Sequence, residues 1–307
     1  MMRLNGQNRI TDELRGAIIA LGNFDGFHKG HQAVAQAAID WAKSENRPVI
    51  IATFDPHPVR HFKPDAPPFR LTTLDQREHL FTAAGADAML VFEFDAQLAA
   101  TTAGDFVEKL LVDRFGAAGV VTGEDFTFGK GRAGNVTVME QLGLPLGLLT
   151  KTVSPVYDDG EVVSSSRIRA ALEEGDCETA ARLLTRPFAI EGPVIHGDKN
   201  GRELGFPTAN IDMGHYLRPK YGIYAVKGRF PDGRVVNGAA NLGIRPSFDP
   251  PKELLEPHFF DLKEDLYGQV IEVELHHFLR GEQKFDDLDA LVVQMDKDCE
   301  QARLLLT

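Results

Sequence analysis

Two histidines, His28 and His31, lie in a glycine-rich segment with the sequence GNFDGFHKGH at positions 22–31. The segment follows an apolar run typical of a strand and precedes a helical pattern. A helix N-terminus presents backbone N–H groups and the positive end of the helix dipole, and glycines let a phosphate approach the backbone. The pattern predicts a phosphate site in which both imidazoles stabilise a transition state. The alternative is that the histidines only cap the helix and the glycines only turn the chain.

Serines and arginines form a second cluster, SSSRIR at positions 164–169, after the strand-like run EVV. Hydroxyl and N–H groups at a helix start, with Arg169 one turn further on, can hold a triphosphate and a departing pyrophosphate. Taken alone, the cluster is better explained as a serine N-cap with solvated arginines. Together with the histidine segment, it predicts a second part of the same nucleotide site.

A third group of polar residues lies in GPVIHGDKNGRELGFPTAN at positions 192–210. Its glycines, among them Gly197 and Gly201, indicate backbone close to phosphate. Thr208 and Asn210 alternate along an extended segment, so their oxygens face one side and can coordinate Mg²⁺, a hard cation that prefers oxygen ligands. A turn rich in glycine and asparagine is the alternative interpretation.

Two familiar nucleotide-binding patterns are excluded. Gly129, Gly131 and Gly134 spell GxGxxG, but this segment does not open the first helix of a βαβ unit, so it is not a dinucleotide fingerprint. The sequence contains no GxxxxGK[ST] loop, which excludes an ordinary P-loop nucleotide-hydrolysing enzyme.

The first half of the chain alternates apolar runs with helical patterns. This alternation predicts βαβ units and a doubly wound parallel sheet with helices on both faces. The expected strands are 17–24, 48–54, 88–94 and 119–123, and the expected helices are 31–45, 73–84 and 103–115.

The chain changes character at Arg186-Pro187, after helical patterns at 166–174 and 177–184. Apolar segments separated by Gly, Pro, Asn and Asp predict a six-stranded antiparallel β-barrel, and apolar residues at helical spacing predict a terminal helix that seals it. We place the boundary at 186, which gives domains 1–186 and 187–307. The expected strands are 188–195, 222–230, 234–241, 258–260 and 270–278, besides the segment that carries Thr208 and Asn210.

The composition limits the class of protein. The 307 residues, 43% of them hydrophobic, are enough for two cored domains, and the net charge of −12 opposes non-specific binding to nucleic acid. We expect a cytoplasmic protein, because no apolar run approaches the roughly 20 residues that cross a bilayer and the N-terminus is too polar for a signal peptide. Cys177 and Cys299 lie far apart, which indicates packing residues instead of a disulfide or zinc site.

The histidine segment resembles the HxGH signature of the nucleotidyltransferase superfamily, and 164–169 resembles its SSTxxR element, with serine for the usual threonine at 166. Together with FDPHP at 54–58 and TGEDFTFGKGRAG at 122–134, they resemble the adenylyltransferase half of the prokaryotic bifunctional riboflavin kinase/FAD synthetases. Aromatic rings suit a flat isoalloxazine ring, although Phe62 and Phe128 are explained equally well as core residues. The resemblance implies that ATP contacts Gly22, Phe24, Asp25, Gly30, Ser165, Ser166 and Arg169, and that flavin contacts Phe54, Pro56, Pro58, Phe62, Asp125 and Phe128.

The second half resembles the riboflavin kinase domain of the same family through its GxPTAN element and the segments NLGIRPSF, LEPHFFD, DLYG and RGEQKF. The resemblance, which covers about residues 15–305, implies ATP at Gly197 and Gly201, Mg²⁺ at Thr208 and Asn210, and Glu256 as the catalytic base. Without the resemblance, Glu256 is explained as a solvated carboxylate at a strand edge. The chain departs from the family pattern at three positions, Thr185, Ser247 and Pro257.

The resemblance implies two sequential reactions. Riboflavin and ATP give FMN and ADP, and FMN and a second ATP give FAD and pyrophosphate, with Mg²⁺ as cofactor. We expect a monomer or weak homo-oligomer without nucleic-acid or membrane partners. One alternative is a nucleotidyltransferase for another phosphate compound with an accessory barrel. A second is a flavin-sensing or RNA-binding module, since HxGH also occurs in aminoacyl-tRNA synthetases.

Overall fold

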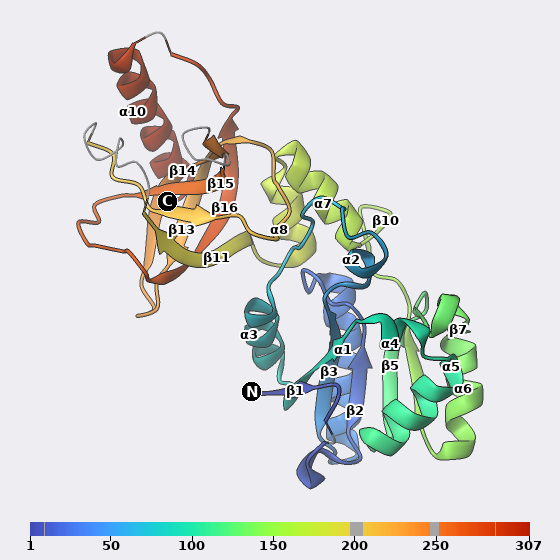
Figure 1. Ribbon diagram of the computed structural model, residues 1–307. Coiled ribbons are helices and arrows are strands. Elements are labelled where there is room, and N and C mark those ends of the chain that lie inside the picture. The colour runs from blue at the N-terminus through green and yellow to red at the C-terminus, as the bar shows by residue number, and fades with distance from the viewer. Residues whose placement is uncertain (9, 197–204, 246–251, 286) are drawn as a thin grey trace. The chain divides into compact units, whose positions relative to one another are not determined.

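The computed structural model describes residues 1–8, 10–196, 205–245, 252–285 and 287–307 (Figure 1). The chain forms two compact units. The first contains Met1–Pro67 and Leu74–Val163, and the second contains Pro68–Thr73 and Ser164–Thr307. Each unit has its own sheet and buried residues, so each is described by itself.

The first unit is built around a six-stranded parallel sheet with the order β1-β4-β3-β2-β5-β8. Its central strands are apolar along almost their whole length because helices cover both faces, which confirms the predicted doubly wound sheet. The strands are β1 Met2–Asn5, β2 Ile18–Leu21, β3 Val49–Asp55, β4 Ala88–Glu93, β5 Gly119–Gly123 and β8 Leu149–Val153.

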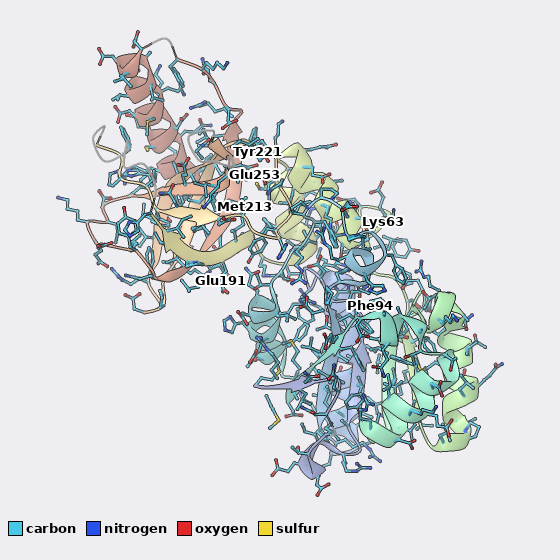
Figure 2. All side chains as sticks on the ribbon, in the orientation of Figure 1. Lys63, Phe94, Glu191, Met213, Tyr221 and Glu253 are labelled. Carbon is cyan, nitrogen blue, oxygen red and sulfur yellow. The ribbon has the colours of Figure 1, made fainter. Side chains whose placement is uncertain are left out.

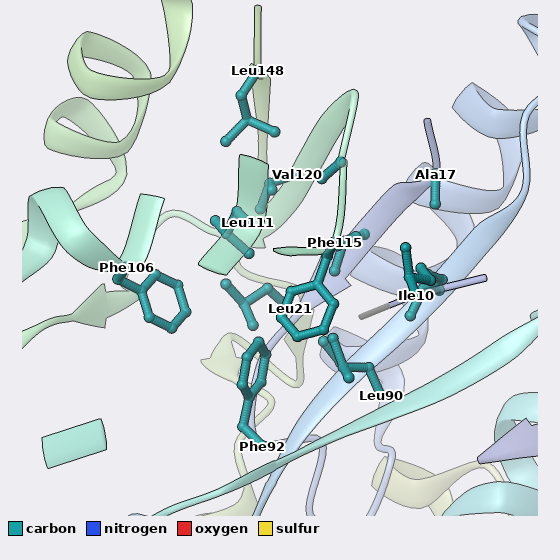
Figure 3. Packing of buried hydrophobic residues seen from close by; sticks show 14 of the residues in the cluster. Ile10, Ala17, Leu21, Leu90, Phe92, Phe106, Leu111, Phe115, Val120 and Leu148 are labelled. Carbon is teal, nitrogen blue, oxygen red and sulfur yellow. The ribbon is translucent and has the colours of Figure 1, made fainter. Parts of the chain in front are cut away.

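Alternate residues of the central strands belong to two hydrophobic clusters, one on each face of this sheet. Leu21 of β2 lies in one cluster with Phe106 and Leu111 of η2 (Phe106–Arg114), as Figure 3 shows. Ile18 lies in the other cluster with residues of α1 (Lys29–Ser44) and α3 (Leu74–Ala84). The helices are α1 Lys29–Ser44, α2 Pro58–Phe62, α3 Leu74–Ala84, α4 Ala96–Ala100, α5 Ala103–Asp105, the π-helix η2 Phe106–Arg114 and α6 Val136–Gly143. Short hairpins pair β6 Thr127–Phe128 with β7 Gly134–Asn135, and β9 Tyr157–Asp158 with β10 Glu161–Val162.

Several elements of the first unit differ from the sequence-based prediction. β2 ends at Leu21 instead of 24, because the chain turns immediately afterwards. The expected helix at 103–115 is divided into α5 and the π-helix η2. The edge strands β1 and β8 were not predicted, because their largely exposed side chains form no apolar run.

The second unit contains a closed antiparallel barrel with the order β11-β12-β15-β14-β13-β16, which confirms the predicted six-stranded barrel. β15 begins at Lys252 instead of 258. The strands are β11 Phe188–Ile195, β12 Asn210–Asp212, β13 Gly222–Arg229, β14 Val235–Arg245, β15 Lys252–Phe259 and β16 Val270–Arg280.

The helices α7 (Ser165–Glu174) and α8 (Cys177–Leu184) belong to the second compact unit. The backbone N–H of Lys220 donates to the carbonyl of Leu172 at 3.0 Å, which ties α7 to the segment before β13. The compact units therefore divide at Ser164, before residue 186. The boundary at 186 stays a prediction about where the two activities divide.

The terminal helix α10 (Leu288–Leu305) packs on the barrel mainly through its C-terminal half. Ala302 is buried in a cluster with Ala225 and Phe260, whereas Leu288 is 65% exposed, so the predicted seal is only partial. A two-point ion pair reinforces this contact, because Arg280 Nε and Nη2 lie 2.9 and 2.7 Å from the two carboxylate oxygens of Asp298.

An Asp298→Ala variant is expected to lower the free energy of unfolding by about 3–5 kcal/mol, because it leaves a largely buried guanidinium without its carboxylate. Asp298 itself is 4% exposed. Urea unfolding followed by circular dichroism measures the change. Glu264→Ala removes one of the two exposed carboxylates that pair with Arg234 and should leave the midpoint unchanged. Equal midpoints for the two variants would contradict the expectation.

Both cysteines are free thiols. Burial raises the pKa of Cys177 to about 12 and that of Cys299 to about 11. Neither forms a thiolate nucleophile at neutral pH, which agrees with the expected packing role.

Candidate active sites

The helix start predicted to bind phosphate brings His28 and His31 together. His28 is the N-cap of α1, and its Nδ1 accepts a hydrogen bond from the backbone N–H of His31 at 3.4 Å. The imidazole rings stack with centroids 3.6 Å apart and planes at 18°. The cap considered as the alternative is therefore present, and it also fixes both rings at the positive end of the helix dipole.

Two glycines of this segment lie against aromatic rings. A Cβ on Gly30 would lie 3.3 Å from the His28 ring, and a Cβ on Gly22 would lie 3.3 Å from the Phe24 ring. Phe24 is buried and meets His31 edge-on, with centroids 5.3 Å apart. Its ring therefore packs against His31. Because the ring is buried, the predicted contact with ATP could come only from the backbone of Phe24. Asp25 is buried as well.

Lys29 ties the start of α1 to the β9–β10 hairpin, a role that the sequence analysis missed. Its Nζ lies 2.7 Å from Asp158 Oδ2. The carbonyl oxygen of Val163, just after β10, lies 3.6 Å from the position of a Cβ on Gly30. The hairpin thus borders the histidines. No local pattern signals this contact, because 129 residues separate the ion-pair partners.

Aromatic contacts connect the predicted flavin residues at the end of β3. Phe54 stacks on Phe92 with centroids 5.4 Å apart and meets Phe94 edge-on at 6.0 Å. Phe94, which is labelled in Figure 2, in turn meets Phe62 edge-on with ring centroids 5.9 Å apart. Phe62 is 67% exposed, whereas Phe54 is buried. Phe62 is therefore the ring that a ligand can reach most easily, and Phe94, which the sequence analysis did not single out, packs against it.

The other predicted flavin residues divide between surface and core. Pro56 and Asp125 are exposed, and Pro58 is half-buried. Phe128 is 6% exposed and stacks on Phe126 with centroids 5.9 Å apart, within the hydrophobic cluster under η2. Phe128 is thus a core residue in this structure. The flavin contacts of all these residues stay predictions.

A cavity of about 260 Å³ lies at the other end of α1. Its lining includes Trp41 and Glu45, whereas the histidines stand at the first residues of the helix, so the cavity is not part of the predicted phosphate site. The lining residues are Trp41, Glu45, Glu140, Leu144, Leu148, Leu149, Thr150 and Lys151.

The serine and arginine cluster forms the start of α7 in the second unit. Ser164 is the N-cap, and its hydroxyl accepts a hydrogen bond from the Arg167 N–H at 3.2 Å. Arg169 Nε donates to the carbonyl of Phe69 at 2.8 Å, and its guanidinium lies over the Phe69 ring. The serine N-cap is therefore present. The predicted ATP contacts of Ser165, Ser166 and Arg169 stay predictions.

The predicted kinase residues meet across neighbouring strands of the barrel. β12 and β15 pair Ile211 with Leu255, and this antiparallel register places Asn210 opposite Glu256. On the other side, Asn241 of β14 pairs with Glu256, and its Nδ2 lies 3.4 Å from Glu256 Oε2. Directly opposed residues point to the same face of a sheet, so these three side chains form a row.

Thr208 lies just before β12 instead of within it, and it is half-buried. The Ala209 N–H donates to the carbonyl of Pro257 at 2.9 Å, which extends the register toward Thr208. Gly197 and Gly201, predicted to bind ATP, lie outside the described residues.

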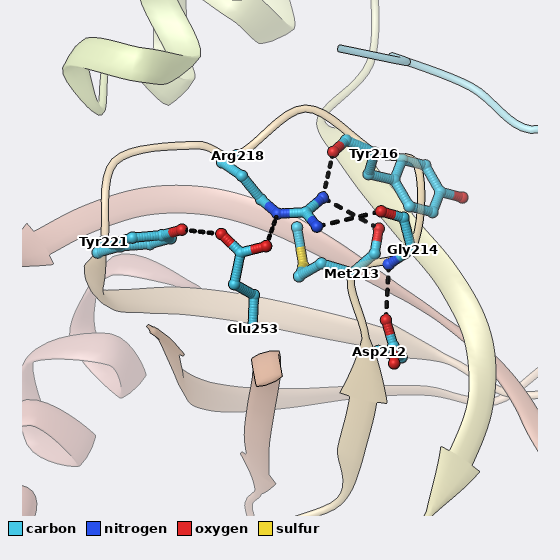
Figure 4. A network of polar contacts seen from close by, with 7 residues as sticks. All are labelled: Asp212, Met213, Gly214, Tyr216, Arg218, Tyr221 and Glu253. Carbon is cyan, nitrogen blue, oxygen red and sulfur yellow. Dashed lines mark hydrogen bonds and ion pairs between the residues drawn. The ribbon is translucent and has the colours of Figure 1, made fainter. Parts of the chain in front are cut away.

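An ionic network fixes the loop that follows β12 (Figure 4). Arg218 Nε donates to Glu253 Oε2 at 2.7 Å, and its Nη2 donates to the Gly214 carbonyl at 3.1 Å. Tyr221 donates to the other oxygen of Glu253. Burial alone would raise the pKa of Glu253, but these hydrogen bonds outweigh it and lower that pKa. Glu253 lies three residues before Glu256, so the network anchors β15 to the segment leaving β12.

The two halves of the chain match two family models. Residues 10–167 match the model described as FAD synthetase, and residues 184–306 match that described as riboflavin kinase.

Full-length relatives carry both names. The chain is 37% identical over 303 residues to a bifunctional riboflavin kinase/FMN adenylyltransferase of Haemophilus influenzae, covering 99% of this chain and 98% of the relative. The protein of that name from Escherichia coli K12 is 37% identical over 288 residues, covering 94% and 92%.

A solved structure from Streptococcus pneumoniae, described as a macrolide-efflux protein, has a TM-score of 0.88 and 28% identity, covering 99% of both chains. In the part of this chain that the structure describes, no helix has the length and apolar character needed to cross a membrane.

Proposed function

The chain belongs to the family of bifunctional riboflavin kinase/FMN adenylyltransferases, and from that membership we propose which residues carry its two reactions. It phosphorylates riboflavin to FMN with ATP and adenylylates FMN to FAD with release of pyrophosphate. We assign adenylylation to residues 1–186 and phosphorylation to residues 187–307.

For adenylylation, we place the triphosphate of ATP at the start of α1. An oxygen of the FMN phosphate attacks the α-phosphorus, the bond from the α-phosphorus to the bridging oxygen breaks, and pyrophosphate leaves. His28 and His31 stabilise the charge that develops on the phosphate chain, and the helix dipole adds to this stabilisation. Ser165, Ser166 and Arg169 bind the departing pyrophosphate. FMN is already an anionic nucleophile at neutral pH, so the site mainly supplies alignment and charge neutralisation.

The isoalloxazine ring of FMN stacks on Phe62 in this proposal. The exposure of Phe62 supports it, since a flat ring needs an open aromatic face. Phe94 holds Phe62 from behind by an edge-on contact at 5.9 Å. Pro56 and Asp125, both exposed, border the flavin.

For phosphorylation, Glu256 accepts the proton of the riboflavin 5′-hydroxyl while that oxygen attacks the γ-phosphorus and ADP leaves. Thr208 and Asn210 hold Mg²⁺. Their oxygens suit a hard cation that keeps several waters and binds mainly through substrate phosphates, and Mg²⁺, when bound, neutralises charge on those phosphates. The observation that carries this assignment is the strand register that places Asn210 opposite Glu256.

A Thr208→Val variant tests the metal assignment. It keeps the shape of the side chain but removes the oxygen ligand, so the Mg²⁺ concentration for half-maximal FMN formation should rise about 10-fold or more. FAD formation from added FMN should keep its Mg²⁺ dependence. Thr179→Val on α8 is the matched control. An unchanged Mg²⁺ dependence of FMN formation in Thr208→Val would remove Thr208 from the metal site.

The proposal also includes the cellular setting of the enzyme. The enzyme acts in the cytoplasm on riboflavin, FMN and ATP, as a monomer or weak homo-oligomer. Its net charge of −12 disfavours a nucleic-acid partner.

A further inference from the structure

A buried arginine of α3 lies under the loop that leads to the two histidines. Arg77 is 1% exposed, and charged side chains are almost never buried to that degree unless they are paired. Its Nη1 donates to Thr53 Oγ1 at 2.8 Å and to the Asn23 carbonyl at 3.2 Å. Thr53 Oγ1 donates to the same carbonyl at 2.7 Å. The Asn23 carbonyl therefore accepts two side-chain hydrogen bonds, one from β3 and one from α3.

Asn23 opens a turn whose backbone is unusual. Phe24 and Phe27 have φ angles of 50° and 45°, the left-handed region that bulky residues rarely adopt. Such conformations cost free energy and persist only where the surrounding structure holds them. The turn ends directly before His28, so its shape determines where α1 begins and where both imidazoles stand.

α3 contacts this turn a second time, one helical turn beyond Arg77. Phe81 meets Phe24 edge-on with centroids 5.8 Å apart and meets Phe27 at 5.1 Å. Arg77 thus fixes the first residue of the turn, and Phe81 packs against the two strained phenylalanines. The aromatic contacts hold the two rings, whereas the hydrogen bonds to one carbonyl orient its peptide.

We propose that Arg77, together with Thr53, is a positioning residue for adenylyl transfer, which holds the Asn23 carbonyl and thereby the turn that presents His28 and His31. The inference rests on the proposed role of the histidines. Neither Arg77 nor Thr53 needs to contact substrate. A shifted turn displaces the imidazoles from the α-phosphate, and a displacement of about 1 Å can reduce a rate about 100-fold.

Steady-state kinetics of the full chain test the proposal. Arg77→Met removes the hydrogen bonds to Thr53 Oγ1 and to the Asn23 carbonyl and should lower kcat for FAD formation about 100-fold, and Thr53→Val should lower it about 10-fold. KM for ATP and FMN should stay within about twofold, because the histidines act mainly in the transition state. FMN formation from riboflavin should be unchanged in both variants. Thr53→Ser keeps the hydroxyl and should restore kcat to within about threefold of wild type.

Controls separate positioning from general destabilisation. Thr82→Val removes an exposed hydroxyl of the same helix, which bonds to the Glu78 carbonyl, and should leave both activities unchanged. If Arg77→Met fails to fold, kcat of the Thr53→Val variant tests the proposal instead. Wild-type kcat for FAD formation in folded Thr53→Val overturns the proposal, as does a parallel loss of both activities. His28→Ala in the same assay separates failure of the positioning proposal from failure of the proposed role of the histidines. An active His28→Ala enzyme would refute the role of His28 itself.

Discussion

A His28→Ala enzyme is expected to form FAD from FMN about 100- to 1,000-fold more slowly than the wild type, because it lacks one preorganised donor to the transition-state charge. It should still convert riboflavin to FMN at the wild-type rate. His28 is 5% exposed and stacks on His31 at the N-terminus of α1, so its removal acts at that site. Chromatographic separation of riboflavin, FMN and FAD after incubation with ATP and Mg²⁺ measures both rates.

The control for this variant must account for the cap. His28 accepts a hydrogen bond from the His31 N–H, and loss of an N-cap alone costs about 1 kcal/mol of helix stability. His28→Asn keeps a strong capping side chain but removes the imidazole. FAD formation should therefore be as low in His28→Asn as in His28→Ala, while the melting temperature stays nearer to the wild type. Wild-type FAD formation in His28→Asn would mean that His28 serves only as a cap.

The local sequence predicted that His28 and His31 lie together, because the two residues are close in the chain. His28 and His31 are separated by one helical turn, and the apolar runs of β2 and β3 mark the sheet that holds them. The edge strands β1 and β8 were missed because their side chains are largely exposed and their pairing with β4 and β5 joins distant segments. Pairing between distant segments leaves no periodic pattern in either one.

Supporting residues were missed for a related reason. Arg77 lies in a helical pattern with Glu78 and His79, where a charged residue is normally solvated, and its partner Thr53 is 24 residues away. Phe94 ends an apolar run, and nothing in that run indicates contact with Phe62. Such residues become visible only when the fold brings distant positions together. The same holds for Glu256, whose role came from the family resemblance and whose neighbour Asn210 came from the strand register.

A Glu256→Gln enzyme is expected to form FMN about 100- to 10,000-fold more slowly, since glutamine keeps the size of the side chain but cannot accept the hydroxyl proton. Its amide oxygen can still accept the hydrogen bond from Asn241 Nδ2, so the row across β12, β15 and β14 should persist. FAD formation from added FMN should be unchanged. The same chromatographic assay, started separately from riboflavin and from FMN, measures the two steps.

Glu253→Gln is the matched control, because Glu253 lies on the same strand, three residues away, and its carboxylate binds Arg218 and Tyr221. Glu253→Gln should reduce stability, since the hydrogen bonds that lower the pKa of Glu253 stabilise the folded state at neutral pH, and this contribution disappears as pH falls through the folded pKa. FMN formation per folded molecule should remain within about threefold of wild type, because the carboxylate network acts on the loop and not on the reacting hydroxyl. Equal losses of FMN formation in the two variants would show that Glu256 supports the barrel without acting as the base. A loss confined to Glu256→Gln separates proton transfer from the architecture that surrounds it.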